Sequence, residues 1–294
     1  MRLLASACIA LLVLVGALGG VAGAKPPQNE EEREAAGKAL TWRNGETLML
    51  PLSHGTLAAP LPLRQLVGAD AVSAYEINNG IDAPQGIEAM LYDRENKGIV
   101  FYQKLGRGYV RLDDWNDVDA DAMLSQLSAD TEEANVQRKA AGIAALHVIG
   151  WLERPHLDRA TNTVRWAVEV MEEGTGPIVN SVALVLGRDG FEKVTWIRVK
   201  AGPPSQMLDT ALASFSFPSG GRYVDYQPGD RVAEYGIASL VAATVGVKLA
   251  AKLGFLAALL VFAKKFGVLL LIPIGLFVAW KKKLFARKNT TDGL

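Results

Sequence analysis

Hydrophobic and polar positions alternate in four consecutive runs near the middle of the chain, and this period of two predicts β-strands. The connections between the runs are short and rich in proline and glycine, such as Arg188-Asp189-Gly190. Short turns join strands that run antiparallel, so the pattern predicts a four-strand meander. The four runs are residues 146–153, 162–171, 178–186 and 192–199.

Shorter strand-like runs precede the meander. Residues 47–52 and 56–59 flank Ser53-His54-Gly55, which predicts a hairpin. Two further strands are expected around Gly106, over residues 98–104 and 108–112.

Helical patterns stand before and after the meander rather than between its strands. Residues 119–141 form the clearest one, with Asp117 and Asp119 at capping positions, and residues 205–215 form another. Helices placed in this way predict an α+β domain. The expected fold is therefore a mainly antiparallel sheet, made of the meander and an N-terminal strand set, with flanking helices and one or more C-terminal membrane helices.

The first residues resemble a secretory signal peptide. A short basic start at Arg2 precedes an apolar run over residues 3–21, and Ala22-Gly23-Ala24 supplies a small-residue cleavage site. The single cysteine, Cys8, lies inside this segment. A cleaved chain would carry no thiol, which excludes disulfides and cysteine nucleophiles.

The C-terminal end is apolar and bounded by lysines. Residues 266–280 hold no charge, and the twenty residues 264–283 form about 30 Å of helix, enough to cross a bilayer if both lysine clusters reach outward. Because basic residues favour the cytoplasmic side, the tail should be cytoplasmic and the main domain outside. The proposed anchor residues are Phe266, Pro273, Trp280, Lys281, Lys282 and Lys283.

A second apolar element, residues 237–263, carries small side chains at every fourth position, which allows helices to approach closely. Self-association, packing against the membrane helix and an interfacial amphipathic helix all remain open for it, as does the chance frequency of alanine and glycine. The stripe consists of Ala238, Ala242, Gly246, Ala250, Gly254 and Ala258.

Charge is distributed unevenly although the formal net charge is zero. Residues 25–236 hold 21 Lys and Arg against 30 Asp and Glu, whereas residues 237–294 hold 9 against 1. An acidic body argues against nucleic acid as a partner, and a basic end suits the anionic inner face of a membrane.

The predicted organisation combines these segments. It comprises a signal peptide (1–24), a mobile leader (25–40), an exported α+β domain (41–236), a small-residue juxtamembrane helix (237–263), a transmembrane helix (264–283) and a cytoplasmic tail (284–294).

Several short motifs in a fixed order resemble a bacterial family known only as domain of unknown function 2167, described as predicted membrane-anchored proteins. The resemblance covers most of residues 41–280, implies placement at a membrane and implies no activity. Leu157 is a departure, since the resemblance implies tyrosine there. The motifs are Gly108-Tyr109-Val110, Glu133-Ala134-Asn135, Gly150-Trp151, Pro155-His156-Leu157-Asp158, Val179-Asn180, Leu186-Gly187-Arg188, Gly190, Arg222-Tyr223, Asp225 and Tyr235-Gly236.

Candidate chemistry is sparse. The three histidines, His54, His147 and His156, show no ligand spacing, and the calcium-loop-like Asp117-x-Asp119-x-Asp121 lacks the glycine and glutamate of such loops. Helix capping is the simpler interpretation of that cluster. We therefore expect no metal and no cofactor.

Polar and aromatic residues at the ends of neighbouring predicted strands form the most site-like constellation. They are expected to converge on one rim as a ligand or partner site, with a purely structural role as the alternative in which Arg188 pairs Asp189 or Asp158. The candidates are Trp151, His156, Asp158, Asn180 and Arg188.

Three functions follow as hypotheses. The first is a non-enzymatic scaffold or binding protein of the bacterial envelope, held in the cytoplasmic membrane by a single span, with membrane lipid, an envelope protein or glycan, or a second copy as partner. The second is an envelope hydrolase that uses His156 and Asp158. The third is a membrane-integrity or transport accessory protein that acts through residues 237–288.

Overall fold

The computed structural model describes residues 30–79, 82–93, 98–140, 144–198 and 205–245. They belong to the larger of two compact units, residues 1–248, and the second unit, residues 249–294, lies outside them. The expected signal peptide and transmembrane helix therefore fall on residues outside the described ranges. None of the helices in those ranges has the length and apolar composition needed to cross a bilayer.

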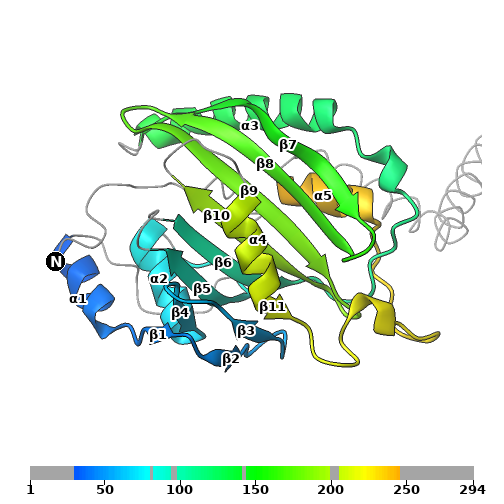
Figure 1. The fold of residues 1–294 in the computed structure, drawn as a ribbon. Coiled ribbons are helices and arrows are strands. Elements are labelled where there is room, and N and C mark those ends of the chain that lie inside the picture. The colour runs from blue at the N-terminus through cyan, green and yellow to red at the C-terminus, as the bar shows by residue number, and fades with distance from the viewer. Residues whose placement is uncertain (1–29, 80–81, 94–97, 141–143, 199–204, 246–294) are drawn as a thin grey trace, which may run out of the picture. The chain divides into compact units, whose positions relative to one another are not determined.

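Helices and strands follow one another along the chain as Figure 1 shows. The helices are α1 (Glu30–Ala39), α2 (Ala69–Asn79), α3 (Ala120–Ala140), α4 (Ser205–Ser214) and α5 (Ile237–Val245), with short 3-10 turns η1 (Trp115–Asp117) and η2 (Tyr223–Asp225). The strands are β1 (Arg43–Asn44), β2 (Thr47–Met49), β3 (Thr56–Ala58), β4 (Arg64–Val67), β5 (Ile87–Asp93), β6 (Gly98–Leu105), β7 (Leu146–Asp158), β8 (Thr163–Glu172), β9 (Gly176–Leu186), β10 (Phe191–Arg198) and β11 (Phe215–Ser216).

An antiparallel sheet of eight strands organises the domain in the order β1-β4-β5-β6-β10-β9-β8-β7, and a second sheet has the order β11-β3-β2. The predicted α+β class and the four-strand meander, β7 to β10, are confirmed. The β2–β3 hairpin is confirmed as well.

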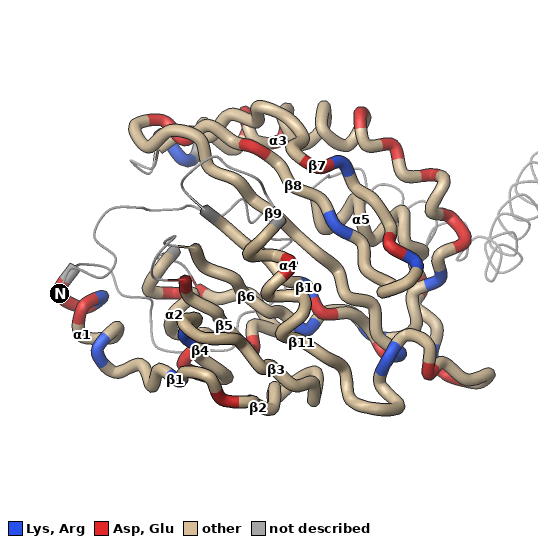
Figure 2. Tube along the Cα trace, viewed as in Figure 1, with Lys and Arg blue, Asp and Glu red and all other residues tan. Residues whose placement is uncertain are grey.

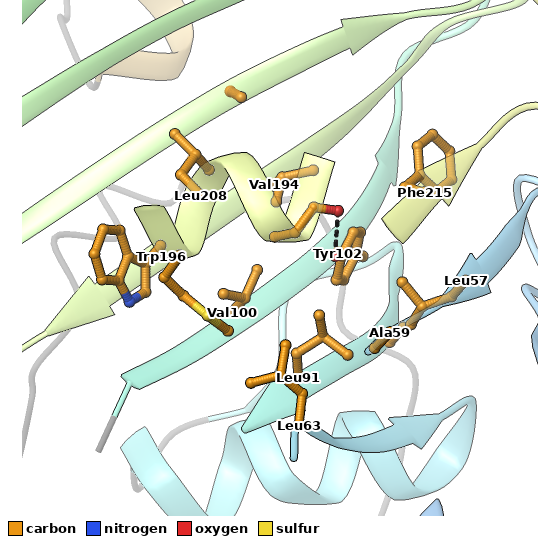
Figure 3. Close-up of a cluster of buried hydrophobic side chains, with 14 of the residues drawn as sticks. Leu57, Ala59, Leu63, Leu91, Val100, Tyr102, Val194, Trp196, Leu208 and Phe215 are labelled. Atoms are coloured by element: carbon orange, nitrogen blue, oxygen red, sulfur yellow. Dashed lines mark hydrogen bonds between the residues drawn. The ribbon is translucent and has the colours of Figure 1, made fainter. Parts of the chain in front are cut away.

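Two apolar layers cover the two faces of the large sheet. On one face α4 and the small sheet pack over the strands, and the Tyr102 hydroxyl donates a hydrogen bond of 2.8 Å to the Ala211 carbonyl of α4 (Figure 3). On the other face α2 packs on β4 to β6 around Tyr75 and Phe101. Phe101 is paired with Thr195 of β10, so the two side chains lie on the same face of the sheet. Thr195 also lines a cavity under α3 and α5, and this cavity therefore lies on the second face.

Two strand predictions were wrong. Residues 108–112 form no strand, because Gly108 has a positive φ of 87° and Tyr109 is hydrogen-bonded to Arg231 and Ala233 in an isolated bridge. Strand β7 continues through Pro155 to Asp158, where the sequence predicted a connection. Proline is tolerated there because β7 is the outermost strand and its register is already irregular around Glu153.

The predicted helix 119–141 is confirmed as α3, and Asp119 caps it. Its Oδ1 accepts hydrogen bonds from the backbone N–H groups of Asp121 (3.1 Å) and Ala122 (2.9 Å). Of the aspartates on the stretch leading into α3, which Figure 2 shows as acidic positions, Asp119 is thus the one that caps the helix N-terminus.

Both flanks of the expected exported domain hold a helix. Residues 30–39 of the expected leader form α1, which contacts α2. At the other end, α5 contacts α3 and η1, and its Ala242 is buried. Since α5 packs on the domain in this way, the folded unit extends past residue 236. Of the small-residue stripe, only Ala238 and Ala242 lie among the described residues.

A pair of buried carboxyl groups lies between the large sheet and the β2–β3 hairpin. Glu88 and Glu192 are both 0% exposed, and Glu88 Oε2 accepts hydrogen bonds from the backbone N–H groups of Leu52 (2.7 Å) and Ser53 (3.0 Å). Burial raises the pKa of Glu192 well above its ordinary value, the Glu88 carboxyl adds to the rise, and Lys104 opposes it. Glu88 Oε1 and both Glu192 carboxyl oxygens are buried without a hydrogen-bond donor among the described residues, so a proton on Glu192 would be shared with the Glu88 carboxyl.

Candidate functional site

The carboxyl ends of β6, β7 and β9 lie at the same end of the large sheet. These three strands run in the same direction, because β8 and β10 are antiparallel to their neighbours. The connections after them, together with residues 217–236, form a surface that we call the sheet rim. It consists of residues 106–112, 158–162, 187–190 and 217–236.

Backbone hydrogen bonds join these segments although they are far apart in sequence. Gly190 N donates to Gly108 O (3.0 Å), and Arg188 N donates to Gly221 O (2.9 Å). Tyr109 N donates to Arg231 O at 2.8 Å. The rim is therefore one connected structure and not a set of independent loops.

Two of the glycines in the motifs are required by this close approach. Gly108 and Gly190 have φ values of 87° and 90°, which L side chains rarely adopt. A Cβ on Gly108 would lie 2.8 Å from Ala233 N, and one on Gly190 would lie 2.6 Å from Leu105 O. The spacing of the motif glycines thus reflects how the rim segments pack.

Two bidentate ion pairs hold residues 217–236 in place. Arg188 donates from Nε and one terminal nitrogen to the two Asp230 carboxylate oxygens, both at 2.7 Å, and from the other to Gly220 O at 3.3 Å. Arg222 and Asp225 form a second pair at 2.9 and 2.7 Å. The Arg222 guanidinium lowers the pKa of Asp225 to about 2, and Arg188 lowers the pKa of Asp230.

Three tyrosine rings stack in the centre of the rim. Tyr109 lies between Tyr223 and Tyr226, with centroid distances of 4.3 and 4.2 Å. The Tyr223 hydroxyl donates to Val110 O at 2.8 Å, and burial raises the pKa of Tyr223. Since Tyr223 belongs to η2, the stack fixes the turn that carries Val224, which is 70% exposed.

The structure brings only two of the five candidate residues to the rim. Asp158 ends β7, and Arg188 follows β9. Asn180 faces α3 and α5 from the middle of β9, and Trp151 lies two strands away on the same face. His156 lies on the opposite face, beside Glu153.

Four of the five candidates have a structural partner, whereas the buried Asn180 Oδ1 has none among the described residues. Trp151 Nε1 donates to Ala120 O (3.0 Å), and Asp158 accepts from Ala160 N and the Thr161 hydroxyl, both at 2.8 Å, in the β7–β8 turn. His156 Nδ1 lies 3.1 Å from Glu153 Oε1. Arg188 pairs with Asp230, not with Asp189 or Asp158 as the sequence suggested.

These contacts do not form a nucleophile–base pair of the type used in hydrolysis. The hydrogen-bonding groups of His156 and Asp158 are directed at other partners, and within the described ranges no cluster of three or more His, Cys, Asp or Glu side chains could hold a metal ion. What the rim offers is a set of fixed arginine, tyrosine and apolar side chains.

An open groove of about 540 Å³ lies between the stretch 115–120 and β7. Trp115, Asp117 and Asp119 line one side, and Arg154 and Pro155 line the other. Arg154 is held by Asp121 at 2.8 Å. Trp115 was not predicted as a site residue, because η1 is too short to give a periodic signal.

Sequence reasoning also missed Tyr226 and Asp230 as rim residues. Asp230 follows Gly229 in a turn-like stretch, and no local pattern indicates that its partner is Arg188 in another segment. Tyr226 lies three residues after Tyr223, but the ring that separates them in space comes from Tyr109.

Fold and rim together define an α+β domain with a preorganised surface at one end of its sheet. The chain belongs to the family described as "Protein of unknown function (DUF2167)", whose profile matches residues 43–275. The resemblance seen in the sequence is thereby confirmed.

Further comparisons are distant. No curated protein matches the chain. Among solved structures it is similar to a solution structure of cyanobacterial PsbP (CyanoP) from Synechocystis sp. PCC 6803, with 11% identity, a TM-score of 0.33, and coverage of 69% of this chain and 99% of that one.

Proposed function

We propose that this protein is a membrane-anchored binding or scaffold protein of the bacterial envelope, and that the sheet rim is its partner-binding surface. The observation that carries the proposal is the Tyr109–Tyr223–Tyr226 stack flanked by two bidentate Arg–Asp pairs. Tyrosine and arginine are enriched where proteins bind partners, and a surface held rigid in advance loses little entropy on binding.

Placement outside the cytoplasmic membrane rests on the sequence. The signal-peptide pattern of residues 1–24 and the lysine-bounded apolar segment 264–283 support an exported domain with a cytoplasmic C-terminus. The folded unit leads toward that segment through α5.

The alternative, an envelope hydrolase using His156 and Asp158, is less well supported. His156 is turned to Glu153, and Asp158 is occupied by its own turn. Replacement of both residues by alanine distinguishes the two functions. Loss of the cellular phenotype with intact folding would favour the hydrolase, and full retention would eliminate it.

Site-specific photo-crosslinking in intact cells tests the binding surface. A crosslinking amino acid at Val224 should give a discrete adduct, whereas one at Leu61, which is 71% exposed in the β3–β4 connection, should not. The Tyr226→Ala change should abolish the adduct at position 224, because it removes one ring of the stack. Equal adducts from both positions, or none from 224, would contradict the proposal.

A further inference from the structure

A small cavity lies inside the domain, away from the rim. It has a volume of about 30 Å³ and is enclosed between β8, β9 and β10 on one side and α3 and α5 on the other. Its apolar walls come from residues such as Leu127 and Trp166. Three polar side chains from the sheet, Asn180, Lys193 and Thr195, also line it.

Lys193 brings a positive charge into this cavity. Its neighbours on the adjacent strands are Gln103 and Leu184, neither of which is acidic. Among the described residues, no acidic side chain lines the cavity and no ion pair involves Lys193. Burial alone lowers the pKa of Lys193 to about 8, so the ammonium form still predominates at neutral pH.

An ammonium group without a counter-charge is costly inside a protein. One polar atom that faces this region is not satisfied. Asn180 Oδ1 is buried and has no hydrogen-bond partner in the described part of the chain, and Thr195 is only 8% exposed. Thr244 is different, because its hydroxyl already donates to Leu240 O at 2.7 Å.

We propose that this cavity binds a halide ion, held by the Lys193 ammonium and the Thr195 hydroxyl. The volume corresponds to the space of roughly two water molecules, which suits a monatomic anion. The Asn180 side-chain amide would donate from its NH₂ group to the same ion, because a flip of the amide exchanges its oxygen and nitrogen without changing its shape. The apolar walls favour chloride or bromide over the strongly hydrated fluoride.

The ion would fasten α5 to the sheet. Helix α5 supplies Thr244 and Val245 to the cavity, while Lys193 and Thr195 come from β10. An anion between them compensates the lysine charge at the contact of these two elements. Halide binding therefore stabilises the junction through which the folded unit leads toward residues 246–263.

Thermal unfolding of the full-length chain in detergent solution tests this site. Sodium chloride is titrated at constant ionic strength, with sodium fluoride as the replacement salt. The unfolding temperature should rise saturably for the wild type and for the control Lys139→Met, a lysine that is 61% exposed. It should not rise for Lys193→Met, and Thr195→Val should raise the half-saturating chloride concentration about three- to tenfold.

Crystals grown in bromide supply a second measurement that does not depend on the variants folding. An anomalous bromide peak beside Lys193 Nζ is the expected result. A cavity that holds water only, or a chloride response that is the same in Lys193→Met as in the wild type, would overturn the proposal.

Discussion

Replacement of Glu192 by glutamine should change how the stability of this protein depends on pH. Glu192 is fully buried beside Glu88, and burial together with the Glu88 carboxyl raises its pKa well above the ordinary value of a glutamate. Glutamine resembles the protonated acid in shape, and its NH₂ group can donate to Glu88 Oε1, which has no partner among the described residues. The variant thus keeps the hydrogen bond but cannot ionise.

The sign and size follow from proton linkage. A carboxyl whose folded-state pKa is raised holds its proton in the native state and releases it on unfolding. Its contribution is fully present below about pH 4.5 and is lost as pH rises toward the folded pKa. Where only the unfolded-state carboxyl is ionised, the slope is about 1.4 kcal/mol per pH unit, so the wild type should lose stability relative to the Glu192→Gln variant as pH rises from about 5 to 7.

Urea unfolding of the full-length chain in detergent solution at three pH values between about 5 and 7 measures this difference. Glu234→Gln, the same chemical change at an exposed carboxyl, serves as the control and should follow the wild type. Parallel stability curves for the wild type and the Glu192→Gln variant would show that Glu192 is ionised in the folded state, and would refute the shared-proton pair.

Three further outcomes are expected. His147 lies 2.7 Å from Glu132 and 3.2 Å from Glu173, and these hydrogen bonds raise its pKa above 6.5. The contribution of His147 to stability is therefore present below about pH 6.5 and is lost as pH rises through the folded-state pKa. The His147→Gln change should lower the urea midpoint more at about pH 5.5 than at about pH 8.5. An equal effect at both pH values would argue against the ionic link. The Leu208→Ala change, at a buried position of α4, should lower the free energy of unfolding in urea by about 2–5 kcal/mol. The Val136→Ala change, at a 72% exposed site, should be nearly neutral. A reporter active only outside the cytoplasm should function when fused after Gly236 and fail after Lys288; the reverse result would end the proposed topology.

Period-two patterning was a reliable guide where one face of a strand packs against a core. The meander was predictable because the buried apolar positions of β8, such as Val164, Trp166 and Val170, alternate mostly with more exposed ones, namely Arg165, Glu169 and Met171, although Ala167 is buried as well. The pattern failed at β4 and β5. Five consecutive residues from Ile87 to Leu91 are buried, because β5 lies inside the sheet and is covered on both faces, so its sequence shows no alternation.

The candidate site was only partly predictable for a related reason. Asp158 and Arg188 could be placed at strand ends from turn residues alone. Whether a strand residue points to one face or the other depends on register, and the predicted strand ended at residue 153, so the face that His156 occupies could not be assigned from the sequence. No local signal pairs Arg188 with Asp230 or inserts Tyr109 between Tyr223 and Tyr226.

By itself the sequence determined the α+β class, the meander, the cap of α3 and the family, because each depends on local period, turn chemistry or motif order. Tertiary structure alone decided which side chains meet. The rim, the Glu88–Glu192 pair and the Lys193 cavity each join segments distant in the chain. Such contacts arise from strand order and from which face each residue occupies, and these are properties of the packed sheet and not of any one segment.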